Sequence, residues 1–270
     1  MKPCDKCKRL HAEPQCPFCL TRRQMVIGAA AIVAAPLALK AQDPPAPAYG
    51  VARPPEPVDK ALDLLDPTQE GWMEDVGLIS AAKAWSSHAA KTRVTLLATH
   101  VVGKNPATKA PTIVTLVKAE KESVTIRVER QKQKPVERGL PIATGITSDA
   151  KVTDLTKETI EIDGTKFECD VKSYEMVGRT FKVWSHKELP FGFAKVSSGD
   201  ETMKLVKAKD SITVKAGTYD CSLWETTTPS GTRRVWRSDK MPGLTVKSEI
   251  KSKDGDETMT VEAQSVVEGK

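Results

Sequence analysis

Four cysteines near the start of the chain have the spacing of a metal site. They form two Cys-x2-Cys pairs, Cys4 with Cys7 and Cys16 with Cys19, separated by eight residues. Each pair can fold two thiolates onto one zinc ion, and two pairs complete a tetrahedral site. We therefore expect zinc at this leader, residues 1–20, and no cofactor elsewhere. The alternative is an unstructured leader whose thiols are incidental.

Residues 21–41 have the layout of an export signal. Arg22 and Arg23 precede an Ala-rich apolar run, and the small residue Ala41 comes before a polar stretch. The arginine pair resembles a twin-arginine signal, and the cysteine leader resembles a shortened zinc ribbon. The first resemblance implies handling by export machinery and a periplasmic or cell-envelope location. Cleavage after Ala41 is the leading prediction, and a membrane anchor through residues 25–39 is the alternative.

The charge balance argues against nucleic acid as a partner. The chain holds 41 Lys and Arg against 35 Asp and Glu, but seven of these basic residues and two of the acidic ones lie in 1–41. The remaining 34 basic and 33 acidic residues nearly cancel. The body of the protein therefore lacks the basic excess typical of nucleic-acid binding.

A linker and a helical segment lead into the main domain. Residues 42–57 contain six prolines, which favour an extended spacer. In the helical segment, 58–90, we expect a short helix over Val58–Leu65 and a second over Met73–His88. The second has an apolar stripe at helical spacing: Val76, Ile79, Ala82 and Trp85.

From residue 91 the pattern changes to strands. Alternation is clear in Ser123–Glu129, and Arg93–Val102 and Pro111–Ala119 have the same period. Residues 131–150, rich in Pro and Gly, are expected to form a loop. Around a dozen strands with local turns predict a mainly β domain over 91–268: one curved antiparallel sheet or half-barrel covered by one or two helices.

A segment is written twice within this domain, at 158–208 and 210–266. An offset of 52 places Cys169 on Cys221, Trp184 on Trp236 and Pro190 on Pro242 without a gap. The matched positions have the character of strand, turn and core residues. We interpret the repeat as a tandem duplication that extended a single sheet.

The repeated motif resembles that of uncharacterised exported bacterial proteins of the domain-of-unknown-function type. The motif is Ala216-Gly217-Thr218-Tyr219-x-Cys221, followed by Trp236-x-Ser238 and Met241-Pro242-Gly243-Leu244. Some of those proteins are similar to periplasmic lipoprotein carriers, in which helices cover an open half-barrel. The resemblance implies a fold for residues 150–266, and it implies no chemistry.

Candidate site residues in the domain each have a structural alternative. Cys169 and Cys221 are either a disulfide or two buried small apolar side chains. Trp184 and Trp236 either line a ligand cavity or fill the core. Arg234 either grips an anionic group or belongs to a solvated strand face.

No motif of a nucleophile, a phosphate loop or a catalytic His cluster is present in the sequence. We therefore predict a non-enzymatic envelope protein that binds a lipid or another hydrophobic component on its curved sheet. The alternative is a structural or protein-interaction module with a filled core. A hydrolase would need a cluster of polar groups with perturbed ionisation.

Overall fold

The computed structural model describes residues 2–3, 10–11, 80–142, 150–176 and 179–270. The chain divides into two compact units, Met1–Ala52 and Arg53–Lys270. In the first unit, β1 (Lys2–Pro3) and β2 (Leu10–His11) form an antiparallel pair. The leader cysteines, the signal and the linker lie outside the described residues, so zinc binding and export stay predictions.

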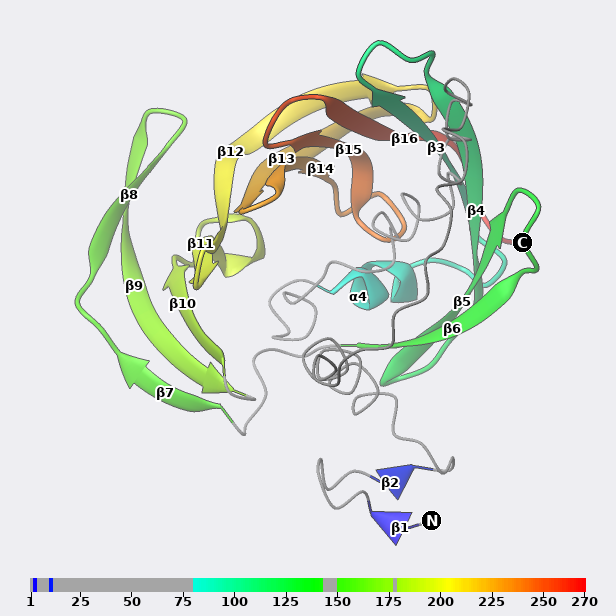
Figure 1. The fold of residues 1–270 in the computed structure, drawn as a ribbon. Helices are drawn as coiled ribbons and strands as arrows, with labels where there is room; N and C mark the ends of the chain where they lie inside the picture. The colour runs from blue at the N-terminus through cyan, green and yellow to red at the C-terminus, as the bar shows by residue number, and fades with distance from the viewer. Residues whose placement is uncertain (1, 4–9, 12–79, 143–149, 177–178) are drawn as a thin grey trace, which may run out of the picture. The chain divides into compact units, whose positions relative to one another are not determined.

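One open antiparallel sheet of 14 strands forms the body of the second unit and curves around a short helix (Figure 1). The predicted curved antiparallel fold is therefore confirmed, and the sheet is not closed. Its strands are β3 (Arg93–Val102), β4 (Thr108–Ala119), β5 (Ser123–Arg130), β6 (Val136–Pro141), β7 (Lys151–Asp154), β8 (Glu158–Ile162), β9 (Thr165–Met176), β10 (Arg179–Ser185), β11 (Phe193–Ser198), β12 (Glu201–Val214), β13 (Gly217–Thr228), β14 (Gly231–Arg237), β15 (Thr245–Ser252) and β16 (Glu257–Val267). A 3-10 turn, η1 (Pro190–Gly192), follows β10.

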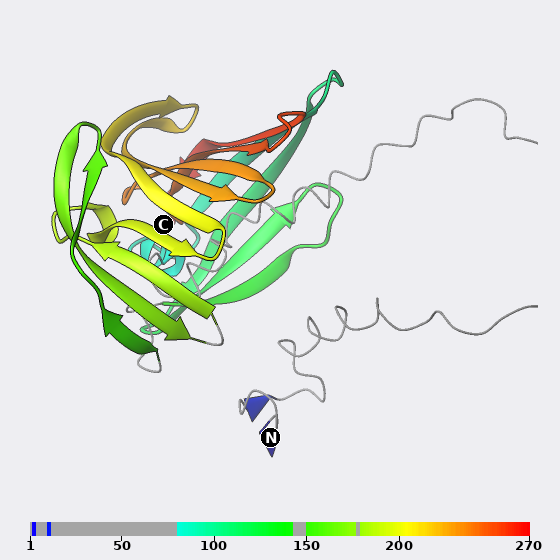
Figure 2. The same cartoon turned by 60° about the vertical axis from the view of Figure 1, so that its left-hand side comes forward.

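Most described strands pair with a neighbour in sequence, and there are two exceptions. Strand β7 pairs with β9, and β3 pairs with β16, which joins the two ends of the domain. The sheet order runs from β6 through β3 to β16, and from there back to β9 and β7, with β8 pairing with β9 as well. The β3–β16 pairing spans both strands, from Arg93 opposite Val267 to Val102 opposite Glu257. Strand β6 is left open at one end of the sheet, and β7 and β8, which each pair with β9 alone, are left open at the other (Figure 2).

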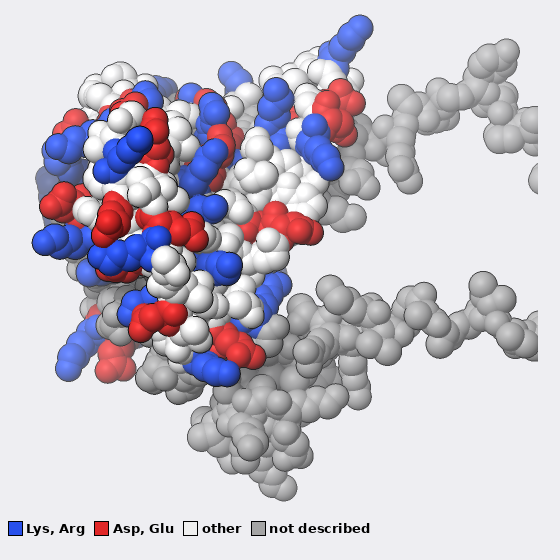
Figure 3. Space-filling view, turned by 90° about the vertical axis from the view of Figure 1, so that its left-hand side faces the viewer, with Lys and Arg blue, Asp and Glu red and all other residues white. Residues whose placement is uncertain are grey.

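Alternation of side chains gives the sheet two different faces. We call the face that carries Val94, Leu96 and Ala98 the inner face, because α4 packs on this side. Following opposite residues across the strands, it continues through Val261 and Val235. The outer face is mostly polar, and positive and negative side chains are interspersed on the side that β7–β12 form (Figure 3).

Helix α4 (Ala81–Ser86) packs against the inner face. Ser80 caps its first turn by accepting a hydrogen bond at Oγ from the Lys83 amide at 3.1 Å. Ala82 and Trp85, from the predicted apolar stripe, are buried. Among the described residues, no helix has the length and apolarity that a membrane crossing needs.

One segment was predicted wrongly. Residues 131–150 were expected to be a loop, but Val136–Pro141 form β6, paired with β5. The burial pattern explains the error, because Gly139 and Pro141 are typical turn residues and β6 is an exposed edge strand. Proline is tolerated at such an edge, where an amide need not join the ladder.

The two sequence copies have matching strands and contacts. The bounds of β9 and β13 differ by 52 positions at both ends, as do those of β10 and β14. The turn after each pair also matches: the His186 amide donates to the Gly192 carbonyl at 3.0 Å, and the Ser238 amide to the Leu244 carbonyl at 2.9 Å. The origin of this correspondence by duplication stays a prediction.

Cys169 and Cys221 are buried free thiols rather than a disulfide. They lie on β9 and β13, and three strands separate these in the sheet. At about 4.8 Å per strand the separation is roughly 19 Å, far beyond the ~7 Å limit between the Cα atoms of a disulfide. Burial, followed by the nearby carboxylates Asp210 and Asp220, raises the pKa of Cys221 to about 11.

We expect both thiols to resist alkylation in the folded protein. Burial raises the pKa of Cys169 as well, so little thiolate forms at pH 8, and the sulfur atoms are shielded. Peptide mass mapping after iodoacetamide treatment should find both residues unmodified in the native state and modified after unfolding, with or without reductant. Labelling that requires a reductant would show a bridge.

Candidate functional site

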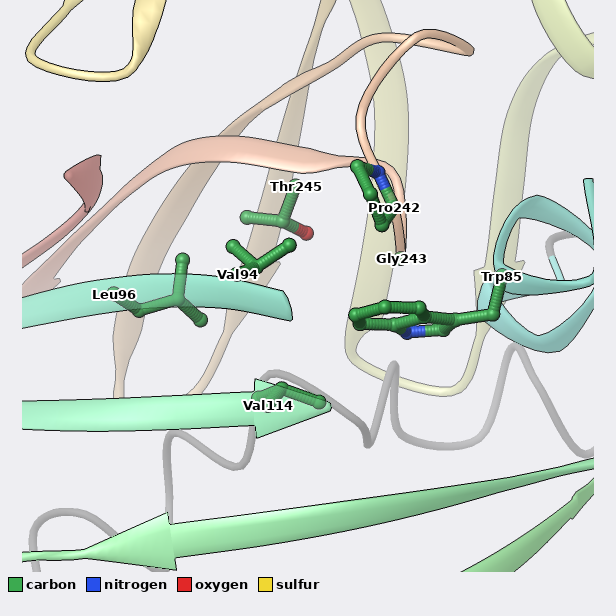
Figure 4. A pocket seen from close by; sticks show the side chains of 7 residues that line it. All are labelled: Trp85, Val94, Leu96, Val114, Pro242, Gly243 and Thr245. Carbon is green, nitrogen blue, oxygen red and sulfur yellow. The ribbon is translucent and has the colours of Figure 1, made fainter. Parts of the chain in front are cut away.

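The strongest candidate site is the seam between α4 and the inner face. Trp85 reaches from the helix across the end of the sheet and lines a small cavity (Figure 4). The other lining residues come from β3, β4, β15 and the turn before β15: Val94, Leu96, Val114, Pro242, Gly243 and Thr245. The free space is about 10 Å³, which holds about one water molecule.

The turn between β14 and β15 shapes one wall of this seam. The Met241 amide donates to the Ser238 carbonyl at 3.1 Å, and the Leu244 amide donates to the Met241 carbonyl at 2.8 Å. Gly243 has a φ of +76°, and a Cβ placed there would lie 2.8 Å from Trp85 Nε1. Glycine is therefore required twice, for the left-handed backbone and for the close approach of the indole.

The chemistry of the seam is apolar. None of the seven lining residues titrates, and the polar side-chain groups are the Thr245 hydroxyl and the Trp85 indole N–H. Such a lining can hold hydrocarbon and offers no acid, base or nucleophile. Within the described parts of the chain, no group of three or more His, Cys, Asp or Glu is placed to hold a metal ion.

The predicted ligand residues lie on the opposite face. The Trp184 indole donates to Glu158 at 2.8 Å, and the Trp236 indole donates to Asp210 at 3.1 Å. Each ring also faces a lysine, with Lys195 Nζ 4.5 Å from the Trp184 ring centroid. The two tryptophans are therefore engaged in equivalent contacts, and neither lines the seam.

Arg234 also has partners on the outer face. Its Nε donates to Glu225 at 2.9 Å, and Lys204 approaches the other oxygen of that carboxylate at 3.1 Å. Burial of Glu225 opposes its charge, but the hydrogen bonds and charges of Arg234 and Lys204 outweigh burial. The pKa of Glu225 is therefore lowered. A role for Arg234 in ligand binding stays a prediction.

Sequence reasoning missed the seam as a site, although its signals were present. Trp85 was recognised on a helical stripe, and Pro242 and Gly243 were recognised in the repeated turn motif. What the sequence lacked was any sign that these segments, more than 150 residues apart, meet at the same end of the sheet.

Comparison with known proteins gives fold neighbours. A protein with a YmcC-like fold from Bacteroides fragilis is 7% identical, with a TM-score of 0.34 over 67% of this chain and 97% of that chain. A LolA superfamily protein from Nitrosomonas europaea is 7% identical, with 0.30 over 71% and 94%. A DUF1329 family protein from Desulfovibrio piger is 6% identical, with 0.32 over 72% and 92%.

A scan against protein-family models finds no match, and a search of curated proteins finds none either. At these identities and TM-scores the neighbours support no assignment of function.

Replacing Gly243 by alanine should detach Trp85 from the turn. The new Cβ would meet the indole at 2.8 Å and would also strain the backbone. We expect a loss of about 2–4 kcal/mol in unfolding free energy, measured by urea denaturation. The matched control is Gly164→Ala, since Gly164 has a φ of +77° with nothing within 4 Å and should lose only about 1 kcal/mol. Equal losses would contradict the role of the Trp85 contact.

Replacing Glu225 by glutamine should remove a stabilisation that depends on pH. The pKa of Glu225 in the folded protein lies below the ordinary 4.5, so its charge stabilises the folded state above pH 4.5. This stabilisation is lost as the pH falls through the pKa of the folded state. At pH 7 we expect Glu225→Gln to cost up to about 1 kcal/mol, since both partners are half exposed. The difference in melting temperature should vanish in acid; a difference that persists there would point to packing instead.

Proposed function

We propose that this chain is an exported envelope protein that binds an acyl chain, or another hydrophobic envelope component, on the inner face of its open sheet. The observation that carries the proposal is the seam. A six-residue helix covers an apolar concave face, and a single indole lines the gap between them. An acyl chain can replace Trp85 against Val94, Leu96 and Val114 with no loss of polar partners, since that surface offers none.

The size of the gap favours a second candidate, a structural or protein-interaction module with a filled core. Space for about one water admits no lipid while Trp85 stays in place. The first candidate therefore requires the indole to move on binding, and the second requires it to stay. This difference makes Trp85 the residue to follow in an experiment.

The apolar lining and the absence of titrating groups around the seam favour binding over catalysis. The export signal predicted at 21–41 supports a place in the envelope, where lipids and lipid-modified proteins are available as ligands.

Native mass spectrometry of the protein purified from its own envelope should find co-purifying lipid. A second measurement locates it: a fatty acid brominated along its chain should quench tryptophan fluorescence, and Trp85→Phe should remove most of that quenching. The matched control is Trp236→Phe on the outer face, which should leave the quenching unchanged. Absence of both lipid and quenching would favour the filled-core module.

A further inference from the structure

Three lysines form a row across adjacent strands on the outer face. Lys195 on β11 is directly opposite Lys204 on β12 and opposite Trp184 on β10, and Lys182 lies two residues before Trp184 on the same face. Lys182 and Lys204 are exposed and Lys195 is half-buried. We call Lys182, Lys195 and Lys204 the lysine row.

This arrangement is unfavourable for the folded protein by itself. Side chains directly opposite on neighbouring antiparallel strands have Cβ atoms about 5 Å apart, and like charges at that spacing repel. Glu225 contacts Lys204, but no ion pair is recorded for Lys182 or Lys195 among the described residues. Lys195 lies over the Trp184 ring instead, so the repulsion within the row is only partly compensated. Positions where a local rule is broken in this way are candidates for function.

The second copy of the repeat provides an internal comparison. At an offset of 52, Arg234 corresponds to Lys182 and Lys247 corresponds to Lys195. Arg234 contacts Glu225, and Lys247 contacts Glu249 at 2.9 Å and Glu262 at 3.3 Å. Burial opposes the charge of Lys247, but these two carboxylates outweigh it and raise its pKa. In the second copy, both Arg234 and Lys247 therefore have carboxylate partners from that copy, although Glu225 is shared with Lys204.

The first copy keeps the cations and lacks the carboxylates. The residues that correspond to Glu225 and Glu249 are Ser173 and Ser197, and the one that corresponds to Glu262, at the offset of 56 found there, is Val206. At these positions the copies differ in the counter-charges, while the strands and the Trp–Lys contact are the same.

Other carboxylates near the row are occupied in ways that do not neutralise it. Glu158 accepts a hydrogen bond from the Trp184 indole N–H, and Asp210 accepts one from Trp236. Each copy therefore has a carboxylate in this role, and it does not distinguish the two copies. Glu175, on the strand beside Lys182, is paired with Lys151 at 4.0 Å. The row therefore keeps an excess of positive charge on a body whose total is close to neutral.

We propose that the lysine row docks this protein on an anionic phospholipid surface. Exposed ammonium groups on an open strand face act as point charges without fixed directional geometry, which suits a layer of mobile phosphate groups. The row is on the face opposite the seam, so docking would leave the inner face free. The inference needs no hydrophobic ligand at the seam and stands independently of it.

Lysine footprinting tests the proposal on the protein as purified from the envelope. The extent of reductive methylation of each lysine is measured by peptide mass spectrometry in three samples. One contains phosphatidylglycerol-containing vesicles, one contains pure phosphatidylcholine vesicles, and one contains no vesicles. We expect protection of the lysine row by the anionic vesicles alone, lost at high salt. Lys109 on β4, and Lys104 and Lys121 in the turns on either side of β4, are exposed; they serve as controls and should stay reactive.

Two triple variants measure how much the lysine row contributes to binding of anionic vesicles. Replacing the lysine row by glutamine should lower partitioning onto anionic vesicles more than tenfold, at about fivefold per lysine. Replacing Lys104, Lys109 and Lys121 by glutamine changes the net charge by the same amount. This control should leave partitioning onto anionic vesicles within about twofold of that of the unmodified protein. Any contribution of residues 1–41 is common to both variants. Circular dichroism should show both folded, because the described contacts that the row loses are only the Lys204–Glu225 ion pair and the Lys195 contact with the Trp184 ring.

Three results would overturn the proposal. Equal losses in the two triple variants would show a net-charge effect, and absence of protection by anionic vesicles would remove the membrane as partner. Protection of the row by polyglutamate but not by vesicles would assign the surface to an acidic protein segment instead.

Discussion

The pairing of β3 with β16 is the constraint on which the second unit depends. Among the described strands it is the one pairing between strands far apart in sequence, and it joins strands β3–β6 to strands β7–β16. Without it, each half would be an open meander with one more free edge. With it, the helix that precedes β3 meets the turn that precedes β15, and the seam at Trp85 exists only because of that meeting. Such long-range pairing is also slow to form, since the chain must close a loop of over 150 residues first.

The curved sheet separates two kinds of chemistry by the alternation of its strands. The inner face is apolar and narrows to a gap with space for about one water, whereas the outer face is lined by ion pairs and by two indole–carboxylate contacts. A hydrophobic ligand and an anionic surface would thus be bound on opposite sides of the same strands. Neighbouring residues of β10 face the two sides, since Val183 is buried and Lys182 is exposed.

The repeat has consequences that are visible only when the two copies are compared in space. Trp184 and Trp236 hold the same place against a carboxylate and a lysine, which explains why these residue types recur at one offset. The copies differ at three carboxylates of the second copy, Glu225, Glu249 and Glu262. The corresponding residues of the first copy are two serines and a valine. The two copies therefore share a structural framework and differ in surface charge, and the surface that differs is where we propose that a partner binds.

The sequence by itself determined the strands, because period-2 alternation, as in β3 and β5, follows directly from burial of one face. It also determined the equivalence of the copies and the closeness of the body to electrical neutrality. It missed β6, an edge strand whose Gly and Pro resemble a turn, and it grouped Trp184, Trp236 and Arg234 as ligand residues. Only the tertiary structure placed those three on the outer face and brought Trp85 to Gly243. Local periodicity shows which side of a strand is apolar, but the partner across that surface is set by pairing between strands far apart in the chain.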